Sequence, residues 1–428
     1  MRIAILGAGV AGLTSAYYLA RDGHEVTVLE KSSGVALHTS YANGAQLSYS
    51  YVAPLAGPGV LPKIPPWLLR RDSPLRFYPA LDPQQWRWLL EFVLACNQAQ
   101  SDLTTRRLLE LSFYSRSLMH AFVHEEPQIE FAYARGGKLV LFSDAAGFDS
   151  ARRLLDYQRS LGCEQDALDR EQCRALEPAL TDPASSLGKR LVGGIHTPGE
   201  EVGDCYSFCV GLEQRLRAMG VAFALDTEIV RLVREGSRIA AVETRNGPVQ
   251  ADHYVLALGA HSAFLARPLG LRLPIYPLKG YSLTLPVGRA APGLSPKLSI
   301  TDFKRKVVYA PLAEPTGDFL RVAGMADIAG YTEKIDPVRL HQLFEESRLA
   351  FPGATDYAAG PQAMQPWTGL RPATPKGTPL LARTPLANLS LNCGHGALGW
   401  TLALGSARAV ADVIKGAAPQ IHVANFAL

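Results

Sequence analysis

Residues 2–30 read RIAILGAGVAGLTSAYYLARDGHEVTVLE, and this stretch decides the fold. Its two apolar runs, Arg2–Leu6 and Glu25–Leu29, are typical of buried parallel strands. Between them, Leu13–Arg21 is typical of a helix, and Gly23 marks the end of that helix. The stretch therefore predicts a strand, a turn, a helix and a second parallel strand.

The turn between the first strand and the helix reads G-x-G-x-x-G. Gly7 permits the tight turn, Gly9 lets a pyrophosphate approach the backbone, and Gly12 lets the helix pack closely on the strand. Free N–H groups at the helix start favour phosphates, and the acid after the second strand accepts hydrogen bonds from a ribose hydroxyl. An adenine dinucleotide is thus predicted, and a glycine turn that binds nothing is the alternative. The residues predicted to contact the dinucleotide are Gly7, Ala8, Gly9, Val10, Ala11, Gly12 and Glu30.

The composition is that of an ordinary globular chain with room for two domains. Of 428 residues, 47% are hydrophobic and 19% are charged, and the net charge of +4 is too small to indicate nucleic acid. The six cysteines form no C-x-x-C pair and the ten histidines show no metal spacing, so we expect reduced thiols and no metal. No apolar run reaches about 18 residues, and the first strand starts at residue 2. We therefore expect a cytoplasmic chain, free or resting on the inner face of the cell membrane.

The strand-and-helix pattern resumes later in the chain, which predicts a domain built from discontinuous segments. Asp252–Leu258 leads as a buried strand into Gly259, and Leu389–Lys415 predicts a glycine-rich strand and helix. The predicted fold class is α/β: a Rossmann-like cofactor-binding domain plus an α+β substrate-binding domain with a mixed or antiparallel sheet. The first domain takes residues 1–80, 145–165, 195–268 and 365–428, and the second takes 81–144, 166–194 and 269–364.

Several separated motifs carry a resemblance to a known family. They are GAGVAG…LE, TSYANGAQLS, EVGDC, YVLALGAHS, YPLKGYSLT, WTGLRPATPKGTP and NCGHGALGWT. With them the chain resembles the flavin-dependent amine oxidoreductases of the D-amino-acid oxidase and glycine oxidase type, almost from end to end. Within that family it is most similar to the bacterial D-amino acid dehydrogenases. The resemblance implies FAD rather than NAD, and glycine-rich strand ends at Gly7, Gly259 and Gly394 suit a cofactor held along its length.

The resemblance also implies which residues meet the substrate. In WTGLRP, Arg371 matches the arginine that binds the amino-acid carboxylate, and a guanidinium can meet a carboxylate with two parallel hydrogen bonds. Tyr281 of YPLKGYS is predicted beside that arginine, with Tyr276 as the other candidate. For both tyrosines a place in the core is the alternative.

A turn near the C-terminus is predicted to contact the flavin ring. By resemblance it lies against the N1–C2=O edge, where a helix N-terminus stabilises the negative charge of the reduced ring. A tight turn with a surface histidine is the alternative, and Cys393, where the family has a small polar residue, leaves a covalent flavin link open. The turn consists of Gly394, His395, Gly396, Ala397, Leu398 and Gly399.

Other residues are predicted along the rest of the FAD. Lys31 lies at the adenosine end, and Ile229 matches a position that meets adenine through its backbone, with a core strand as its alternative. The segment predicted to cross the middle of the cofactor contains Ser40, Asn43, Gly44, Ala45 and Gln46.

The implied activity is oxidative deamination of D-amino acids. Hydride passes from the substrate Cα to N5 of FAD, the product hydrolyses to a 2-oxo acid and ammonia, and the electrons go to a membrane quinone rather than to oxygen. A dehydrogenase for D-hydroxyproline or D-proline, an oxidase of the glycine or sarcosine type, and a subunit that only relays electrons remain alternatives. Residues 52–71 are apolar and proline-rich and end in two arginines. They predict either a loop at a lipid or quinone surface or one packed on the second domain.

Overall fold

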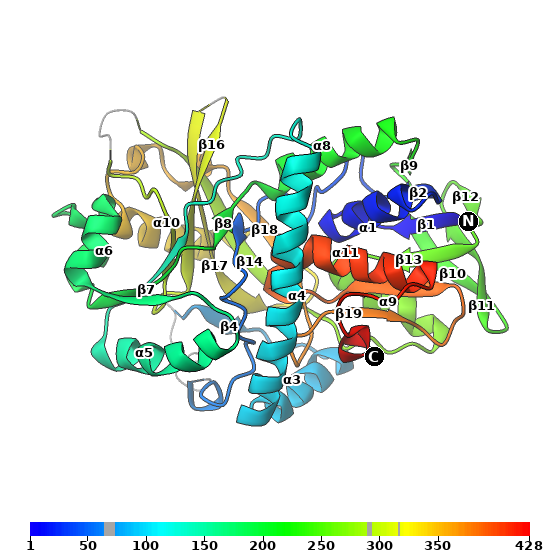
Figure 1. Cartoon of the computed structure of the whole chain (residues 1–428), viewed down its shortest axis with the longest axis horizontal. Helices are drawn as coiled ribbons and strands as arrows, with labels where there is room; N and C mark the ends of the chain where they lie inside the picture. Colours follow the sequence, from blue (N-terminus) through cyan, green and yellow to red (C-terminus); the bar gives the residue numbers. More distant parts are fainter. Residues whose placement is uncertain (64–72, 289–292, 316) are drawn as a thin grey trace.

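The computed structural model describes residues 1–63, 73–288, 293–315 and 317–428. Figure 1 shows two sheets side by side, the N-terminal one at the right and the other at the left. The long helix α4 (Gln98–Glu125) runs across the front between them. The two-part α/β architecture that the sequence predicts is confirmed.

The first sheet has β1 at its centre, as the opening stretch predicts. In the described residues it holds six strands, and all neighbours are parallel except β19 and β20. The core strands β1 and β2 are almost entirely apolar and buried on both faces, which is typical of parallel sheets. In order, the strands are β19 (Leu380–Arg383), β20 (Leu389–Cys393), β13 (His253–Leu256), β1 (Arg2–Leu6), β2 (Glu25–Leu29) and β9 (Ala222–Ala224).

Helices cover one face of this sheet and small strands cover the other. The helical layer contains α4, α1 (Val10–Arg21), α8 (Cys205–Ala218) and α11 (Gly399–Lys415), which share one apolar core. By length and hydropathy the stretch Gly396–Lys415 could also cross a membrane, but 67% of it is buried, as expected of a core helix. The opposite layer contains β10 (Ile229–Glu235), β11 (Arg238–Thr244), β12 (Gly247–Val249) and α9 (Ser262–Ala266).

The second sheet is mixed, as predicted. Among the described residues it has nine strands, and the β5–β15 and β4–β17 pairs are parallel while the others are antiparallel. Helix α10 (Pro337–Ala350) packs on one face of its centre. The strands are β18 (Trp367–Ala373), β14 (Tyr276–Pro286), β17 (Gly317–Ile328), β16 (Val307–Glu314), β15 (Ser299–Asp302), β5 (Lys138–Phe142), β7 (Gly193–Thr197), β6 (Asp166–Asp169) and β4 (Leu75–Phe77).

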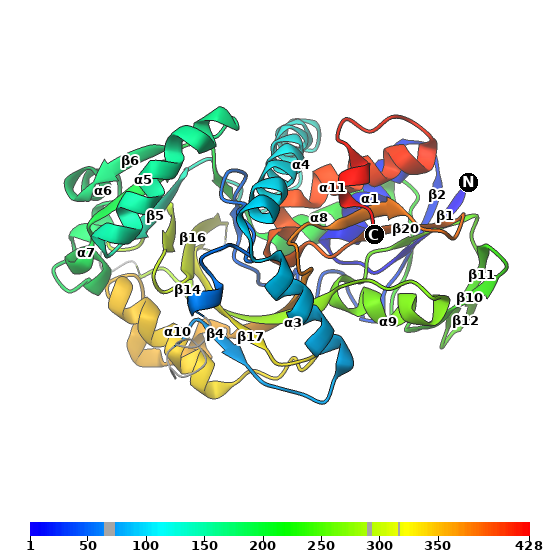
Figure 2. The same ribbon diagram turned by 90° about the horizontal axis from the view of Figure 1, so that it is seen from below.

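Short elements complete the molecule. Strands β3 (Gln46–Leu47) and β8 (Glu201–Val202) form a two-stranded sheet where the two large sheets meet. Figure 2, seen from below, shows α3 in front and α5, α6 and α7 at the far end of the second sheet. These helices are α3 (Pro83–Ala95), α5 (Ala145–Ser160), α6 (Arg170–Leu176) and α7 (Ser186–Arg190).

At least four predicted domain assignments are wrong. The sequence assigns strand β4, within residues 1–80, to the first sheet, but this strand pairs with β17 of the second. The sequence assigns helix α5 to the first sheet, but its Phe148 and Leu155 pack on β5 and β7 of the second. It also assigns strand β18 to the first sheet, but this strand pairs with β14. Helix α4 is predicted with the second sheet, yet its Leu108 and Met119 lie in the core of the first. Each error concerns a long-range contact, which local patterns do not encode.

The run 52–71 is only partly inside the described residues, because 64–72 lie outside them. In its first part, Val52 and Ala56 are buried, and Ala56 packs with Trp88 of α3 in one core. Leu55 is exposed. The described part of the run is therefore packed on the second sheet at Ala56, while a lipid or quinone surface formed by this run stays a prediction.

Candidate cofactor and substrate site

Each glycine of the N-terminal turn stands there for a different structural reason. A Cβ on Gly12 would lie 1.9 Å from the carbonyl oxygen of Gly7, so this helix packs on the turn only with glycine there. Gly7 has a φ of +108°, and a Cβ on it would lie 2.8 Å from the carbonyl of Ala257. A Cβ on Gly9 would meet only the Ser40 hydroxyl at 3.5 Å. The fold itself requires Gly7 and Gly12, whereas the free space at Gly9 suits a ligand.

The acid that follows β2 lies beside this turn. Glu30 is 8% exposed, and its carboxylate accepts hydrogen bonds from the backbone N–H groups of Ala8 (2.9 Å) and Ser32 (3.0 Å). The N–H of Thr227 donates to the carbonyl of Glu30, which brings the start of β10, with Ile229, next to it. The adenosine-end candidates thus gather at one edge of the first sheet.

The segment 40–46 lies between the two sheets. On the side of the first sheet, the N–H of Val10 donates to the Ser40 hydroxyl (3.1 Å). On the side of the second, the Ser282 hydroxyl of β14 donates to the carbonyl of Ala42 (2.6 Å). The segment is therefore fixed from both sides, as expected for one that crosses the middle of an elongated cofactor.

Asn43 shapes the middle of this segment. Its side-chain oxygen accepts a hydrogen bond from the N–H of Ala45 (2.9 Å), a residue with the left-handed φ of +54°. Its carbonyl accepts from Arg321 of β17 (2.9 Å), which also forms a buried ion pair with Asp204 (2.9 Å). A Cβ on Gly44 would lie 3.3 Å from a Val308 methyl group, so this glycine is close to the second sheet.

A buried lysine supports the end of the segment, and sequence reasoning missed it. The Nζ atom of Lys138 donates to the side chains of Gln46 (3.0 Å) and Ser48 (2.8 Å). Burial lowers the pKa of Lys138 to about 8, while nearby Glu200 opposes this shift. In the sequence Lys138 only precedes an apolar run, so nothing marked it as a partner of Gln46.

Arg371 lies on β18, and its guanidinium crosses the neighbouring strand β14. A Cβ on Gly280 would lie 2.3 Å from Nη2 of Arg371, so glycine at this position makes room for the guanidinium. Nη1 donates to the carbonyl of Met325 (2.8 Å), whose φ of +60° lies at an irregularity in the β14–β17 pairing. Strain of this kind in a non-glycine residue is often found at functional sites.

The charge of Arg371 has no acidic partner in the part of the chain that the structure describes. The nearby carboxylate of Asp327 instead forms a buried ion pair with Arg339 (2.7 Å). Burial lowers the pKa of Arg371 from its usual value, and Asp327 partly opposes the shift. Arg371 is half-buried, and a partly desolvated guanidinium without a carboxylate is costly, so this geometry favours an anionic ligand.

The prediction that Tyr281 lies beside Arg371 is wrong. Along β14 the side chains of Gly280 and Tyr281 point to opposite faces, and Arg371 is on the face of Gly280. The Tyr281 hydroxyl donates to Asp327 (2.9 Å), in the core that α10 covers. Burial and this carboxylate raise the pKa of Tyr281 well above its usual value.

Tyr276 lies on the same face of the sheet as Arg371, since it pairs with Ala373 of β18. It is completely buried, with its ring 6.3 Å from that of Trp88 and 6.0 Å from that of Tyr331. Burial and Asp82 raise its pKa. Of the two predicted phenols, Tyr276 is the one on the face of Arg371. It is packed in a core with Trp88, as its alternative expects, and its contact with substrate stays a prediction.

The turn 394–399 adjoins the strand of Arg371. His395 forms a β-bridge with Ala373, and Gly394 and Gly396 have left-handed φ values of +78° and +57°. The Thr39 hydroxyl donates to the carbonyl of Leu370 (3.0 Å), which ties the residue before the 40–46 segment to β18 as well. The structure therefore brings the predicted flavin turn, the flavin segment and Arg371 together.

His395 is buried, so the surface-histidine alternative is wrong. Its Nε2 lies 3.1 Å from the Ser406 hydroxyl of α11, and burial lowers its pKa to about 4. The imidazole is thus neutral at pH 7 and braces the turn on the helix. Ala397 stays exposed, and Leu398 and Gly399 are half-buried.

Cys393 is an inert thiol in this arrangement. It lies in an apolar core, and burial raises its pKa to about 12. A thiol of this kind is a poor nucleophile, which argues against a covalent link to flavin. All six cysteines are free and buried. Cys205 and Cys209 of α8 lie in the apolar core beside the first sheet, as expected of small apolar residues.

The remaining predicted residues lie around this cluster. Gly259 follows β13 with a φ of +55°, and a Cβ on it would have no neighbouring atom within 4 Å, so its surroundings are open. Lys31 is exposed next to Glu30. With the open positions at Gly9 and Gly396, the residues fit an elongated dinucleotide whose flavin end lies near Arg371.

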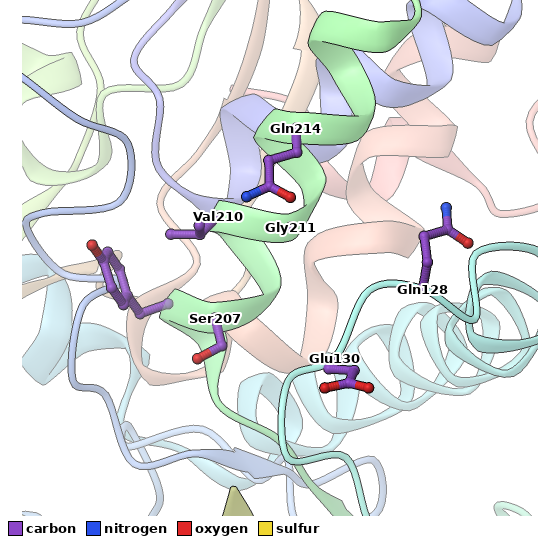
Figure 3. A pocket seen from close by; sticks show the side chains of 7 residues that line it. Gln128, Glu130, Ser207, Val210, Gly211 and Gln214 are labelled. Atoms are coloured by element: carbon purple, nitrogen blue, oxygen red, sulfur yellow. The ribbon is translucent and has the colours of Figure 1, made fainter. Parts of the chain in front are cut away.

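Figure 3 shows a separate hollow beside α8. It has a volume of about 310 Å³ and is lined by Ser207, Val210 and Gln214 of the helix and by Gln128 and Glu130 of a loop. None of the predicted site residues lines it. We therefore place the candidate site at the Arg371 cluster and not in this hollow.

The low pKa of His395 predicts a pH-dependent stability. As the pH falls from 6.5 towards 4, the unfolded chain takes up a proton that the folded His395 does not, so stability is lost in this window. The loss amounts to about 3 kcal/mol. When the pH is lowered from neutral to 4, we expect the Tm of His395→Gln to decrease less than the Tm of the wild type. The exposed His422→Gln is the control and should follow the wild type, and equal acid loss in all three proteins would contradict the assignment.

Comparison with known proteins identifies relatives over the full chain. The family model for FAD-dependent oxidoreductases matches residues 2–413. The chain is 49% identical to D-amino acid dehydrogenase 2 of Ralstonia nicotianae, covering 100% of both chains. It is 46% identical to D-amino acid dehydrogenase 2 of Pseudomonas aeruginosa, covering 99% of this chain and 97% of that one. Among solved structures, glycine oxidase from Geobacillus kaustophilus has a TM-score of 0.77 at 20% identity, covering 100% and 98%.

Proposed function

The chain belongs to the family of FAD-dependent oxidoreductases, and from this premise we propose that it is a D-amino acid dehydrogenase. Relatives at 49% and 46% identity over essentially the whole chain carry that name. The observation in this structure that supports it most directly is the half-buried guanidinium of Arg371, which has no acidic partner among the described residues. An amino-acid carboxylate supplies the missing negative charge.

The described residues account for binding and orientation. Arg371 binds the carboxylate, and its own position is fixed by the Met325 carbonyl and by the space at Gly280. Bound FAD would supply the acceptor for the hydride that leaves the substrate Cα. The neutral His395 holds the adjacent turn on α11 without placing a second positive charge beside the site. The released imino acid hydrolyses in water to a 2-oxo acid and ammonia.

The substrate is tested by mixing the purified FAD-loaded protein with single amino acids in the absence of air. We expect D-alanine and other D-amino acids to bleach the flavin absorbance, and the L-enantiomers to leave it unchanged. Bleaching by D-proline or D-hydroxyproline alone would favour the cyclic imino acid alternative. Bleaching by L-amino acids but not by D-amino acids would contradict the proposal.

The proposed electron acceptor is a membrane quinone rather than oxygen, with the chain in the cytoplasm on the inner face of the membrane. The support is that the named relatives are dehydrogenases and not oxidases. During turnover of D-alanine in air, we expect little hydrogen peroxide and rapid reduction of an added soluble quinone. Stoichiometric peroxide from the purified protein would instead indicate an oxidase of the glycine or sarcosine type.

A further inference from the structure

Helix α3 has two apolar faces, and only one of them meets the protein core. The inner face is formed by Gln85, Trp88, Phe92 and Ala95, which are buried. The outer face is formed by Trp86, Leu90, Val93 and Leu94, which are 51%, 60%, 43% and 68% exposed. These outer positions follow the i, i+4, i+7, i+8 spacing of a single helix face. A surface helix in water usually carries polar residues there.

The apolar surface continues beyond the helix. Leu81, just before α3, is 106% exposed, and Tyr78 is also exposed. We call Tyr78, Leu81, Trp86, Leu90, Val93 and Leu94 the α3 surface. Figure 1 shows α3 at the lower edge of the molecule, and Figure 2, seen from below, shows it in front of its neighbours. Helix α3 therefore lies at an edge of the molecule.

The charges around the α3 surface favour an anionic boundary. Among the residues that the structure describes, Arg87 and Arg272 lie beside it and are 62% and 51% exposed. Glu91 is less exposed and is paired with both arginines. Asp82 caps the helix by accepting from the N–H of Gln84. The two arginines thus share one carboxylate, and both are more exposed than Glu91.

Tryptophan at this position also suits a membrane interface. The indole N–H of Trp86 donates to the carbonyl of Ala80 (2.8 Å), so the protein itself satisfies the polar atom of the ring. The rest of the ring is free to enter an apolar environment without an unpaired donor. Aromatic residues with flanking arginines are typical of helices that lie in the plane of the lipid interface.

We propose that the α3 surface inserts into the surface of a bilayer that contains anionic lipid. A bilayer surface can take up exposed apolar side chains, and this contact needs no complementary hydrogen bonds. The outer face enters the acyl boundary, while Arg87 and Arg272 contact phosphate groups of lipids. This contact rests on the proposed function and places the enzyme beside the proposed membrane acceptor.

The test is co-sedimentation of the FAD-loaded full chain with vesicles of phosphatidylcholine containing phosphatidylglycerol. The variant is Trp86→Gln with Leu90→Gln and Leu94→Gln. The matched control carries the same number of changes at exposed apolar residues elsewhere, Leu154→Gln, Val230→Gln and Val338→Gln. We expect the α3 variant to lose binding by about tenfold or more, and the control to bind like the wild type. Arg87→Glu should weaken binding to these vesicles but not to pure phosphatidylcholine.

Activity with a soluble dye and the Tm are measured on every variant, so failure of the membrane proposal is distinguishable from failure of the proposed activity. Wild-type protein that stays in the supernatant, or equal loss in both triple variants, would overturn the proposal. A wild-type dimer that the α3 changes dissociate, without vesicle binding, would also overturn it and assign the surface to a second copy of the chain.

Discussion

Arg371→Ala is expected to raise the KM for D-alanine by about 30- to 5000-fold, the factor that corresponds to losing about 2–5 kcal/mol of a buried charge-paired hydrogen bond. The guanidinium already has its backbone partner, the Met325 carbonyl, and has no acidic partner among the described residues. Its remaining donors are therefore available for a carboxylate. Steady-state kinetics with a soluble dye, together with flavin content, measure the effect.

The flavin content of Arg371→Ala should stay at the wild-type level, because the predicted FAD contacts lie on other residues. Arg231→Ala is a suitable control, since Arg231 is exposed and pairs only with Glu243 on β11. It should leave KM unchanged. A KM for Arg371→Ala that equals that of the wild type would remove Arg371 from substrate binding.

Gly9→Ala is expected to weaken FAD binding by about 100-fold or more while the apoprotein still folds. Gly9 has φ −76° and ψ 176°, which alanine adopts without strain, and its Cβ would meet only the Ser40 hydroxyl at 3.5 Å. The protein therefore tolerates the methyl group, but the pyrophosphate that approaches this backbone does not. Fluorescence titration of the apoprotein with FAD measures the affinity.

Gly12→Ala provides the contrast. Its Cβ would lie 1.9 Å from the Gly7 carbonyl oxygen, so the helix itself must move. We expect this variant to lose both FAD binding and Tm, whereas Gly9→Ala apoprotein should keep the Tm of wild-type apoprotein. Wild-type FAD affinity in Gly9→Ala would show that no phosphate lies at this turn.

The parts of the fold that the sequence predicts well are local. The β1–α1–β2 unit depends on apolar runs and glycines that are close in sequence. The structure has both strands at the expected residues, and the helix begins at Val10 rather than at Leu13, within the glycine turn itself. The prediction for strand β18 names the wrong sheet because its partner, β14, is about ninety residues away. No pattern within Trp367–Ala373 states which edge it joins.

The face of a strand is predictable only when one face is polar. Strand β14 is buried along almost its whole length, so its sequence carries no alternation that separates the Gly280 face from the Tyr281 face. The prediction for Tyr281 failed for this reason. The outer face of α3 posed the same difficulty, because an apolar helix pattern does not say which stripe the core covers.

Arg371 could be found because its motif is specific, whereas the groups that position it could not. Met325 takes a left-handed φ within a strand, and Lys138 reaches Gln46 across two elements. Both depend on backbone geometry and on contacts far apart in sequence. The motif therefore identifies Arg371, and the structure adds the residues that hold the site in place.

The central claim is that the chain holds FAD with Arg371 beside the flavin ring, and one titration tests both parts. Pyruvate, the 2-oxo acid product of D-alanine, is added to the oxidised protein while its visible spectrum is recorded. We expect a yellow protein whose flavin bands shift in the wild type and stay unshifted in Arg371→Ala at the same concentrations. A protein that stays colourless after reconstitution with FAD, or equal shifts in both proteins, would contradict the account.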